Sequence, residues 1–165
     1  TFSDEEDSGV KMKLHSTDYF SETENKIESG NLMHSILQRI YTKSDTEKIL
    51  TDMTLNGLIA QDELPSIRQK MEDFFSISGV EEWFEPKYKV LNETDIIMAD
   101  KGICRPDRIL LDGKNAIVID YKFGEKELDK YTRQVSEYMR LIAEMGYSVK
   151  GYICYGSLKK VVAVE

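Results

Sequence analysis

Residues 105–122 read RPDRILLDGKNAIVIDYK. Two apolar runs flank the polar pair Asp112-Gly113, which is typical of a tight β-hairpin turn. Because side chains alternate across a strand, a loop of even length places Asp107, Asp120 and Lys122 on one face of this hairpin. The stretch therefore predicts two carboxylates and one ammonium group gathered on one face of a β-hairpin.

The length of the loop sets the register between the two acids. A two-residue turn at Asp112-Gly113 places Asp107 opposite Val118, with Asp120 as the diagonal neighbour. A four-residue loop over 112–115 places Asp107 directly opposite Asp120. Either register brings the Cβ atoms to roughly 4.5–8 Å, a gap that one Mg²⁺ with oxygen ligands at about 2.0–2.1 Å can bridge. A three-residue loop would separate the acids and exclude such a site.

The second apolar run indicates where this hairpin lies in the fold. Residues 116–119 are apolar without alternation, as expected for a central strand covered on both faces. Two carboxylates at its end repel each other by several kcal/mol unless a cation neutralises them or one is protonated. The alternative is a surface hairpin, in which Asp120 and Lys122 form a solvated ion pair worth at most about 1 kcal/mol. The apolar flanks and the paired Asp107 favour the metal site.

Hydrophobic periodicity outlines the remaining elements. Apolar residues at helical spacing predict three helices before any strand, over 30–42, 45–58 and about 65–76. Strands are expected at 84–92, 95–99, 103–111 and 115–122, followed by a long amphipathic helix over 127–145 that ends at Gly146. Residues 147–155 and 158–164 predict two closing strands. This order favours an α/β fold, a mixed β-sheet flanked by helices with an N-terminal helical portion.

Composition limits the class of protein. A chain of 165 residues forms one ordinary domain. Its 22 basic and 30 acidic residues give a net charge of −8, which argues against coating nucleic acid by bulk positive charge. A metal nuclease is still compatible, because its site is acidic until its cation binds. Cys104 and Cys154 are too few for a disulfide framework or a four-ligand metal cluster, so we expect free thiols in a reducing cytoplasm. No apolar run reaches about 18 residues, so no membrane span is expected.

The two ends of the sequence suggest a domain taken from a longer protein. The chain begins without Met and passes through an acidic segment at 4–7. We interpret 1–29 as an acidic linker or lead-in and 30–165 as the folded domain. The apolar run at 161–164 has the character of a natural C-terminus.

Four further residues are candidates for the site. A lone helical histidine such as His34 is more often a core residue, and it becomes a candidate ligand only if its helix packs beside the hairpin acids. Gln134 and Tyr138 share one face of the long helix. A buried Gln134 needs a hydrogen-bond partner, which could be Lys122, a phosphate or a backbone carbonyl. Glu93 is either a supporting acid or a solvated turn residue.

Taken in order, these motifs resemble the PD-(D/E)XK nuclease superfamily. More narrowly, the chain is similar to the RecB/AddAB-type nuclease domain at the C-terminus of UvrD-like helicases. The resemblance runs from about residue 30 to 165 and rests on four motifs. These are Gly30-x-x-x-His34-x-x-Leu37, Arg105-Pro106-Asp107, Asp120-Tyr121-Lys122 with the following Gly124, and Gln134-x-x-x-Tyr138. Each motif is weak alone, and the four in this order are more specific.

The resemblance implies a restriction-endonuclease-like fold and a role for each matching position. Asp107, Asp120, His34 and the backbone carbonyl of Tyr121 would hold Mg²⁺ or Mn²⁺. Lys122 would orient or help to activate the attacking water. Supporting or DNA-binding roles would go to Gln134, Tyr138, Arg105 and Glu93. Some relatives carry four cysteines for an iron–sulfur cluster, and because this chain lacks them, that cluster does not carry over.

The expected function is a metal-dependent deoxyribonuclease. The resemblance implies an exonuclease module of an ATP-dependent helicase-nuclease in double-strand-break repair and recombination, in a bacterial-type cytoplasm. Its partners would be DNA and helicase domains of the same polypeptide or of a partner subunit. The alternative is a catalytically silent fold that docks a protein or DNA partner. An RNA or nucleotide hydrolase would share the same site chemistry.

Overall fold

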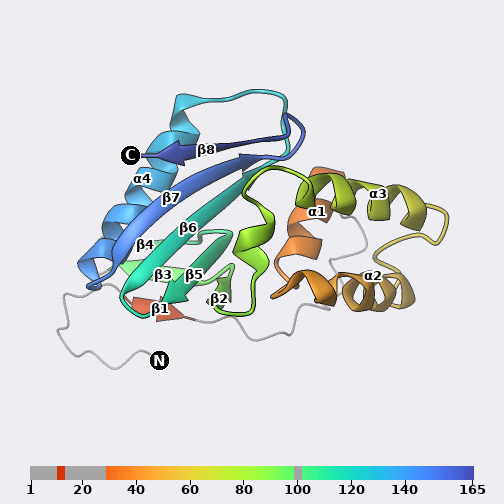
Figure 1. The fold of residues 1–165 in the computed structure, drawn as a ribbon, viewed down its shortest axis with the longest axis horizontal. Helices are drawn as coiled ribbons and strands as arrows, with labels where there is room; N and C mark the ends of the chain where they lie inside the picture. The colour runs from red at the N-terminus through yellow and green to blue at the C-terminus, as the bar shows by residue number, and fades with distance from the viewer. Residues whose placement is uncertain (1–10, 14–28, 99–101) are drawn as a thin grey trace.

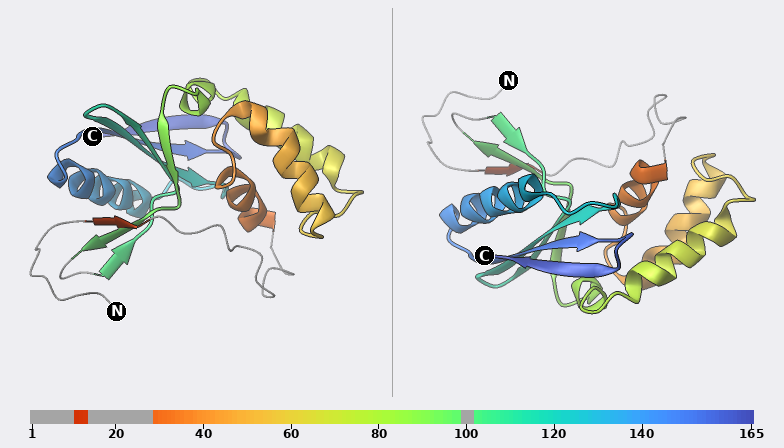
Figure 2. Two further views of the ribbon diagram at one scale, coloured as in Figure 1. Left: turned by 90° about the horizontal axis from the view of Figure 1, so that it is seen from below. Right: turned by 90° about the horizontal axis from the view of Figure 1, so that it is seen from above.

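A computed structural model of the chain describes residues 11–13, 29–98 and 102–165. Figure 1 shows a twisted β-sheet with one long helix, α4, along one side and the N-terminal helices grouped beyond its other side. The two views of Figure 2 show the same separation of α4 from the N-terminal helices. None of the helices in the described ranges is long and apolar enough to cross a membrane.

The main sheet has five strands in the order β2-β5-β6-β7-β8. Their bounds are Lys89–Asn92, Arg108–Asp112, Asn115–Lys122, Ser148–Tyr155 and Lys160–Val164. Neighbouring strands are antiparallel except β6 and β7, which are parallel. A parallel pair needs a long crossover connection, and α4 (Asp129–Glu144) supplies it. The mixed sheet flanked by helices confirms the predicted fold class.

The β5–β6 hairpin has the second of the two expected registers. Leu111 pairs with Ala116 and Asp112 with Asn115, so the register centred on Asp112-Gly113 is wrong. The two central turn residues are instead Gly113 and Lys114, of which only Gly113 has a positive φ, 59°. A glycine at the first central position fits a type II′ turn, whereas a type I′ turn needs positive φ at both central residues. This register aligns Asp107 with Asp120.

A small second sheet was not predicted. It consists of β1 (Lys11–Lys13), β3 (Asp95–Met98) and β4 (Gly102–Cys104), in the order β1-β3-β4. The single strand expected over 103–111 is therefore wrong, because it divides into β4 and β5, which lie in different sheets. The division falls at Pro106, which has no backbone N–H to donate to a continuous ladder. Strand β1 falls inside the expected lead-in, and the boundary at residue 30 stays a prediction.

The N-terminal half is helical, as predicted, although the first helix ends at Leu37 and not at residue 42. It contains α1 (Ser29–Leu37), η2 (Lys43–Asp45), α2 (Thr46–Leu55), α3 (Leu64–Phe75) and the short 3-10 helix η3 (Glu81–Phe84). The strand expected from residue 84 is wrong in its first part, since Phe84 closes η3 and β2 begins at Lys89. Trp83 and Phe84 are both buried, and helical turns let two adjacent rings reach the same core.

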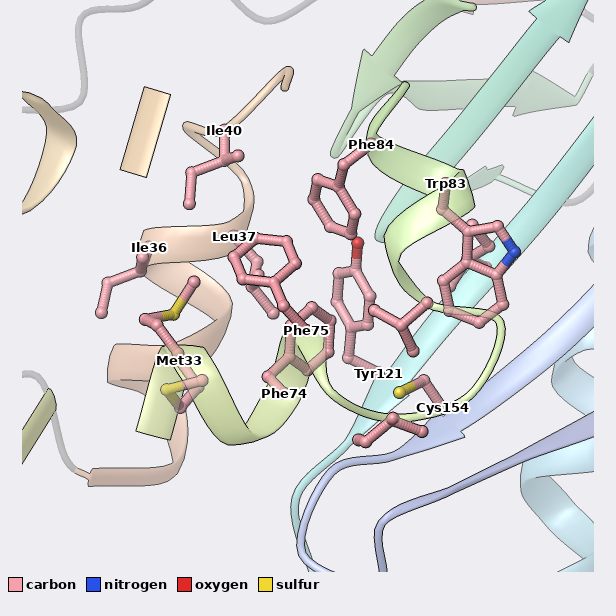
Figure 3. Packing of buried hydrophobic residues seen from close by; sticks show 14 of the residues in the cluster. Met33, Ile36, Leu37, Ile40, Phe74, Phe75, Trp83, Phe84, Tyr121 and Cys154 are labelled. Carbon is pink, nitrogen blue, oxygen red and sulfur yellow. The ribbon is translucent and has the colours of Figure 1, made fainter. Parts of the chain in front are cut away.

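Hydrophobic cores cover both faces of β6, which confirms it as a central strand. Ile119 and Tyr121 belong to the core shared with α1, α2, α3 and η3. Figure 3 shows Tyr121 extending from β6 among Phe74, Phe75 and Phe84. Ala116 and Val118 pack in the other core, under α4. Asp120 and Lys122 follow the second set in the alternation of the strand, so their side chains leave β6 on the side of α4.

Gly151 sets the distance between α4 and the sheet. A Cβ atom at this position would lie 2.4 Å from Met139 Sδ and 2.9 Å from a methyl carbon of Val135. With any other residue at 151, Met139 and Val135 would have to move, so glycine permits this close approach without repacking. Since α4 carries Gln134 and Tyr138, the close packing brings the helix face with these two residues down onto the end of β6.

Candidate active site

The two hairpin acids meet at the C-terminal end of β6. Asp107 lies just before β5, and its Oδ2 accepts a hydrogen bond of 2.7 Å from the backbone N–H of Tyr121. Asp120 is 3% exposed. Burial, followed by the charge of Asp107, raises the pKa of Asp120 to about 7, while Lys122 acts in the opposite direction. The fold therefore holds a carboxylate pair that water does not fully solvate.

Lys122 lies against this pair and is held by two groups from α4. Its Nζ is 2.8 Å from Asp120 Oδ2 and donates a hydrogen bond of 3.2 Å to Gln134 Oε1. The same ammonium group lies 4.5 Å from the centre of the Tyr131 ring, within the range of a cation–π contact. Of the possible partners for Gln134, the structure selects Lys122.

Asp120 Oδ2 is a buried oxygen without a well-formed hydrogen bond, although Lys122 is within ion-pair distance. A buried carboxylate oxygen in this state keeps lone-pair capacity for a cation.

Tyr138 completes the face that α4 presents to the site. It is 5% exposed and lies four residues after Gln134, with which its hydroxyl interacts. Burial, followed by the charge of Asp120, raises the pKa of Tyr138, so this phenol stays neutral. The Q-x-x-x-Y spacing therefore places an amide and a phenol next to Lys122 and Asp120.

His34 approaches the acids from the opposite side of the sheet. Its Nε2 is 3.0 Å from the backbone carbonyl oxygen of Tyr121 and 3.5 Å from Asp107 Oδ2. The Phe123 ring stacks edge-on against the imidazole at 5.1 Å. The condition set for a ligand role, that α1 packs beside the hairpin acids, is met. Asp107 and His34 thus hold the N–H and the C=O of the same residue, Tyr121.

Glu93 is hydrogen-bonded to Asp107, and Arg105 forms an ion pair with Glu93. The backbone N–H of Glu93, at φ 44°, donates to Asp107 O at 3.0 Å. Burial and then the charge of Asp107 raise the pKa of Glu93, so this residue is not a fully solvated turn acid. Arg105 forms an ion pair with Asp95 at 2.8 Å and a longer one with Glu93 at 3.9 Å.

Three residues near the site were missed in the sequence. Tyr131 was assigned only to the apolar face of α4, although its position three residues before Gln134 places both on one face. Phe123 follows the D-x-K motif directly, but nothing in the sequence indicated its contact with His34. Gln38 lies one helical turn after His34, and with its amide nitrogen facing Glu93 it donates to that carboxylate at 2.7 and 2.9 Å.

The side chains at this site fit a divalent cation by their chemistry. Two carboxylates, a backbone carbonyl and one imidazole form a mainly oxygen set of the kind that suits Mg²⁺ or Mn²⁺. Across the described ranges, no group of three or more His, Cys, Asp and Glu side chains is already arranged to hold an ion. His34 contacts the Tyr121 carbonyl and Lys122 contacts Asp120, so binding requires both contacts to open.

Comparison with known proteins supplies the family. The model of the PD-(D/E)XK nuclease superfamily matches residues 10–157, and the chain belongs to this superfamily. Its members generally use divalent metal ions. The search of curated proteins gives no match to the chain.

Proposed function

We propose that the chain is a metal-dependent nuclease that hydrolyses DNA phosphodiester bonds. One observation carries this proposal: Asp107 and Asp120 meet at the end of a buried strand, with Lys122 beside them. A fold that only docks a partner gains nothing from a buried pair of repelling acids. Membership of a nuclease superfamily supports the reaction class, while the substrate is argued from the site.

Four groups would hold the ion: the carboxylates of Asp107 and Asp120, the carbonyl of Tyr121 and the imidazole of His34. When bound, the ion supplies Lewis acidity, which lowers the pKa of water and neutralises charge on the phosphate. The hydrogen bond from Tyr121 N to Asp107 fixes that carboxylate and the neighbouring carbonyl in one rigid unit.

Lys122 would provide the fixed positive charge at the phosphate. Gln134 and Tyr131 hold its ammonium group at the rim of the site without neutralising it. A preorganised cation placed where negative charge develops lowers the barrier of phosphoryl transfer. Tyr138 supports Gln134, and Arg105 with Glu93 supports Asp107.

We further propose a RecB/AddAB-type nuclease, working as the exonuclease module of a helicase-nuclease in double-strand-break repair. Its partners would be DNA and helicase domains of the same polypeptide or of a partner subunit. The contact of His34 with the Tyr121 carbonyl and that of Gln134 with Lys122 support this narrower assignment, because they connect the first and last family motifs to the hairpin.

A nuclease assay on linear single- and double-stranded DNA tests the proposal. With Mg²⁺ or Mn²⁺ we expect the whole chain to shorten or cut the DNA, and we expect excess EDTA or Asp107→Asn to abolish this. RNA of the same sequence, run in parallel, tests the choice of DNA. Cleavage that survives in EDTA would contradict the metal role, and DNA binding without cleavage in either metal would favour the silent docking fold.

A further inference from the structure

A groove of about 320 Å³ lies beside the candidate active site. Two of its walls are helical, with Met33 from α1 and Lys70 from α3. The others are Phe123, which follows β6, and the turn between β7 and β8, which includes Lys159. Figure 1 and the right-hand view of Figure 2 both place this turn close to α1 and α3. The groove therefore opens at the same end of the sheet as Asp120 and Lys122.

The groove adjoins the site through the contact between Phe123, in its wall, and the candidate ligand His34. Met33 precedes the candidate ligand His34, and Phe123 follows Lys122. The Phe123 ring contacts the His34 imidazole at 5.1 Å and also lines the groove. A strand whose phosphate lies at the site would therefore meet Phe123 with its neighbouring nucleotide.

The β7–β8 turn is fastened to the residues that follow the D-x-K motif. Gly156 N donates to Lys122 O at 2.9 Å, and Ser157 Oγ donates to Phe123 O at 2.7 Å. A Cβ at Gly156 would lie 2.5 Å from the Phe123 ring, so glycine makes room for it. Lys159 adopts a positive φ of 52°, an uncommon conformation for a residue with a side chain. These contacts hold Lys159 in a defined place relative to the site.

The charge of the groove differs from that of the whole chain. Lys70 and Lys159 are exposed, and within the described ranges neither forms a salt bridge. The one carboxylate in the wall, Asp73, accepts a hydrogen bond of 3.0 Å from Gln69. Two lysines against one acid give the groove a positive excess in a chain whose net charge is −8. Unpaired lysines around an aromatic ring are the combination that binds single strands.

We propose that this groove binds the single nucleic-acid strand next to the phosphodiester that is cleaved. Lys70 and Lys159 contact its phosphates, and Phe123 packs against a sugar or base. The inference rests on the proposed function and names the path of its substrate. A volume near the lower end of ligand pockets suits one nucleotide and not a duplex.

Binding of a fluorescent single-stranded oligonucleotide in EDTA tests the groove without cleavage or metal. Replacing both lysines, Lys70→Ala with Lys159→Ala, should weaken binding about tenfold and lower the salt slope by roughly 1.4, because each lost phosphate contact removes about 0.7. Lys114→Ala is the matched control, since this exposed lysine lies at the other end of β6. Asp73→Asn should tighten binding, an effect that damage to the fold does not produce.

The outcomes separate this inference from the proposed function. Normal cleavage by the wild type, with unchanged binding in the double variant, would overturn the groove and leave the nuclease intact. Wild-type binding that falls in the double variant, without cleavage in any metal, would leave the groove and overturn the nuclease. If Lys114→Ala loses as much binding per charge removed as the double variant, net charge explains the effect and the groove proposal is contradicted.

Discussion

Asp120 lies in surroundings that disfavour its charged form. Burial and the neighbouring Asp107 raise its pKa from 3.8 to about 7, even though Lys122 is 2.8 Å away. Below about pH 7 the Asp120 carboxyl is therefore mostly protonated in the folded chain, whereas in the unfolded chain it ionises near its ordinary pKa of 3.8. Ionisation of Asp120 thus disfavours the fold, and the site stores free energy that a bound cation can release.

Asp120→Asn should raise the stability of the metal-free chain in a pH-dependent way. Because the folded pKa is higher than the unfolded pKa, the wild type loses stability as the pH rises from about 4 to about 7. The variant lacks this loss, so the difference in melting temperature should grow across that window and correspond to roughly 4 kcal/mol at most. Thermal melts in EDTA measure it, and parallel curves for the two proteins would contradict the raised pKa.

Lys122→Ala should reduce turnover without weakening the metal site. Removing one preorganised charge at a developing negative centre lowers the rate by about 10²–10³. The affinity for Mn²⁺ should stay the same or increase, since Lys122 competes for Asp120. Single-turnover cleavage and calorimetric titration with Mn²⁺ provide the two values, and an equal loss in both would make Lys122 a structural residue.

Tyr131 positions Lys122 through its ring. A cation–π contact at a partly exposed site is worth about 1 kcal/mol, so Tyr131→Leu should lower kcat roughly fivefold with little change in KM. Tyr131→Phe keeps the ring and should retain the wild-type rate. If Tyr131→Phe loses as much activity as Tyr131→Leu, the hydroxyl and not the ring is responsible. If only KM changes, Tyr131 contacts the DNA and does not position Lys122.

Among the elements, the loop after α1 is tied to the sheet by one buried cation. The guanidinium of Arg108 in β5 donates to the carbonyls of Ile40, Tyr41 and Trp83 at 2.7–3.0 Å. It also stacks on the Phe84 ring, 4.0 Å from the centroid. Arg108 is fully buried, and burial lowers its pKa. This clamp fixes the end of α1, the helix that carries His34.

Arg108→Met should destabilise the chain by about 3–5 kcal/mol. The substitution keeps an apolar stem of similar length but leaves several buried carbonyl groups without a donor. Arg108→Lys should fall between wild type and Met, because an ammonium group cannot reach all the carbonyls in a planar fork. Urea unfolding gives the free energies, and a loss below about 1 kcal/mol for the Met variant would contradict the clamp.

Local sequence patterns were sufficient for some elements of this fold and not for others. Hydrophobic periodicity predicted β6 and α4 to within two residues at either end, since both elements bury apolar faces along their whole length. The break at Pro106 and the buried Arg108 were not predictable in the same way. Both depend on a second sheet and on the carbonyls of a distant loop, which no local pattern encodes.

On the scale of the whole molecule, the site lies at the end of β6, the strand that contributes to both hydrophobic cores. His34 comes from the helical half, and 87 residues separate it from Tyr121, the residue it contacts. Gln134 and Tyr131 come from α4 on the other face of the sheet. The sequence motifs include most of these residues. The contact between His34 and the hairpin could not be predicted from them, because it depends on how α1 packs against the sheet.

Anomalous X-ray scattering at the manganese absorption edge, from crystals soaked in Mn²⁺, tests the central claim most directly. We predict a peak in contact with the carboxylates of Asp107 and Asp120 and the carbonyl of Tyr121, and its loss in Asp107→Asn. The Lys122 ammonium should move away from Asp120 in the soaked crystal. A peak held by other residues, or none at these two carboxylates under saturating Mn²⁺, would contradict the claim.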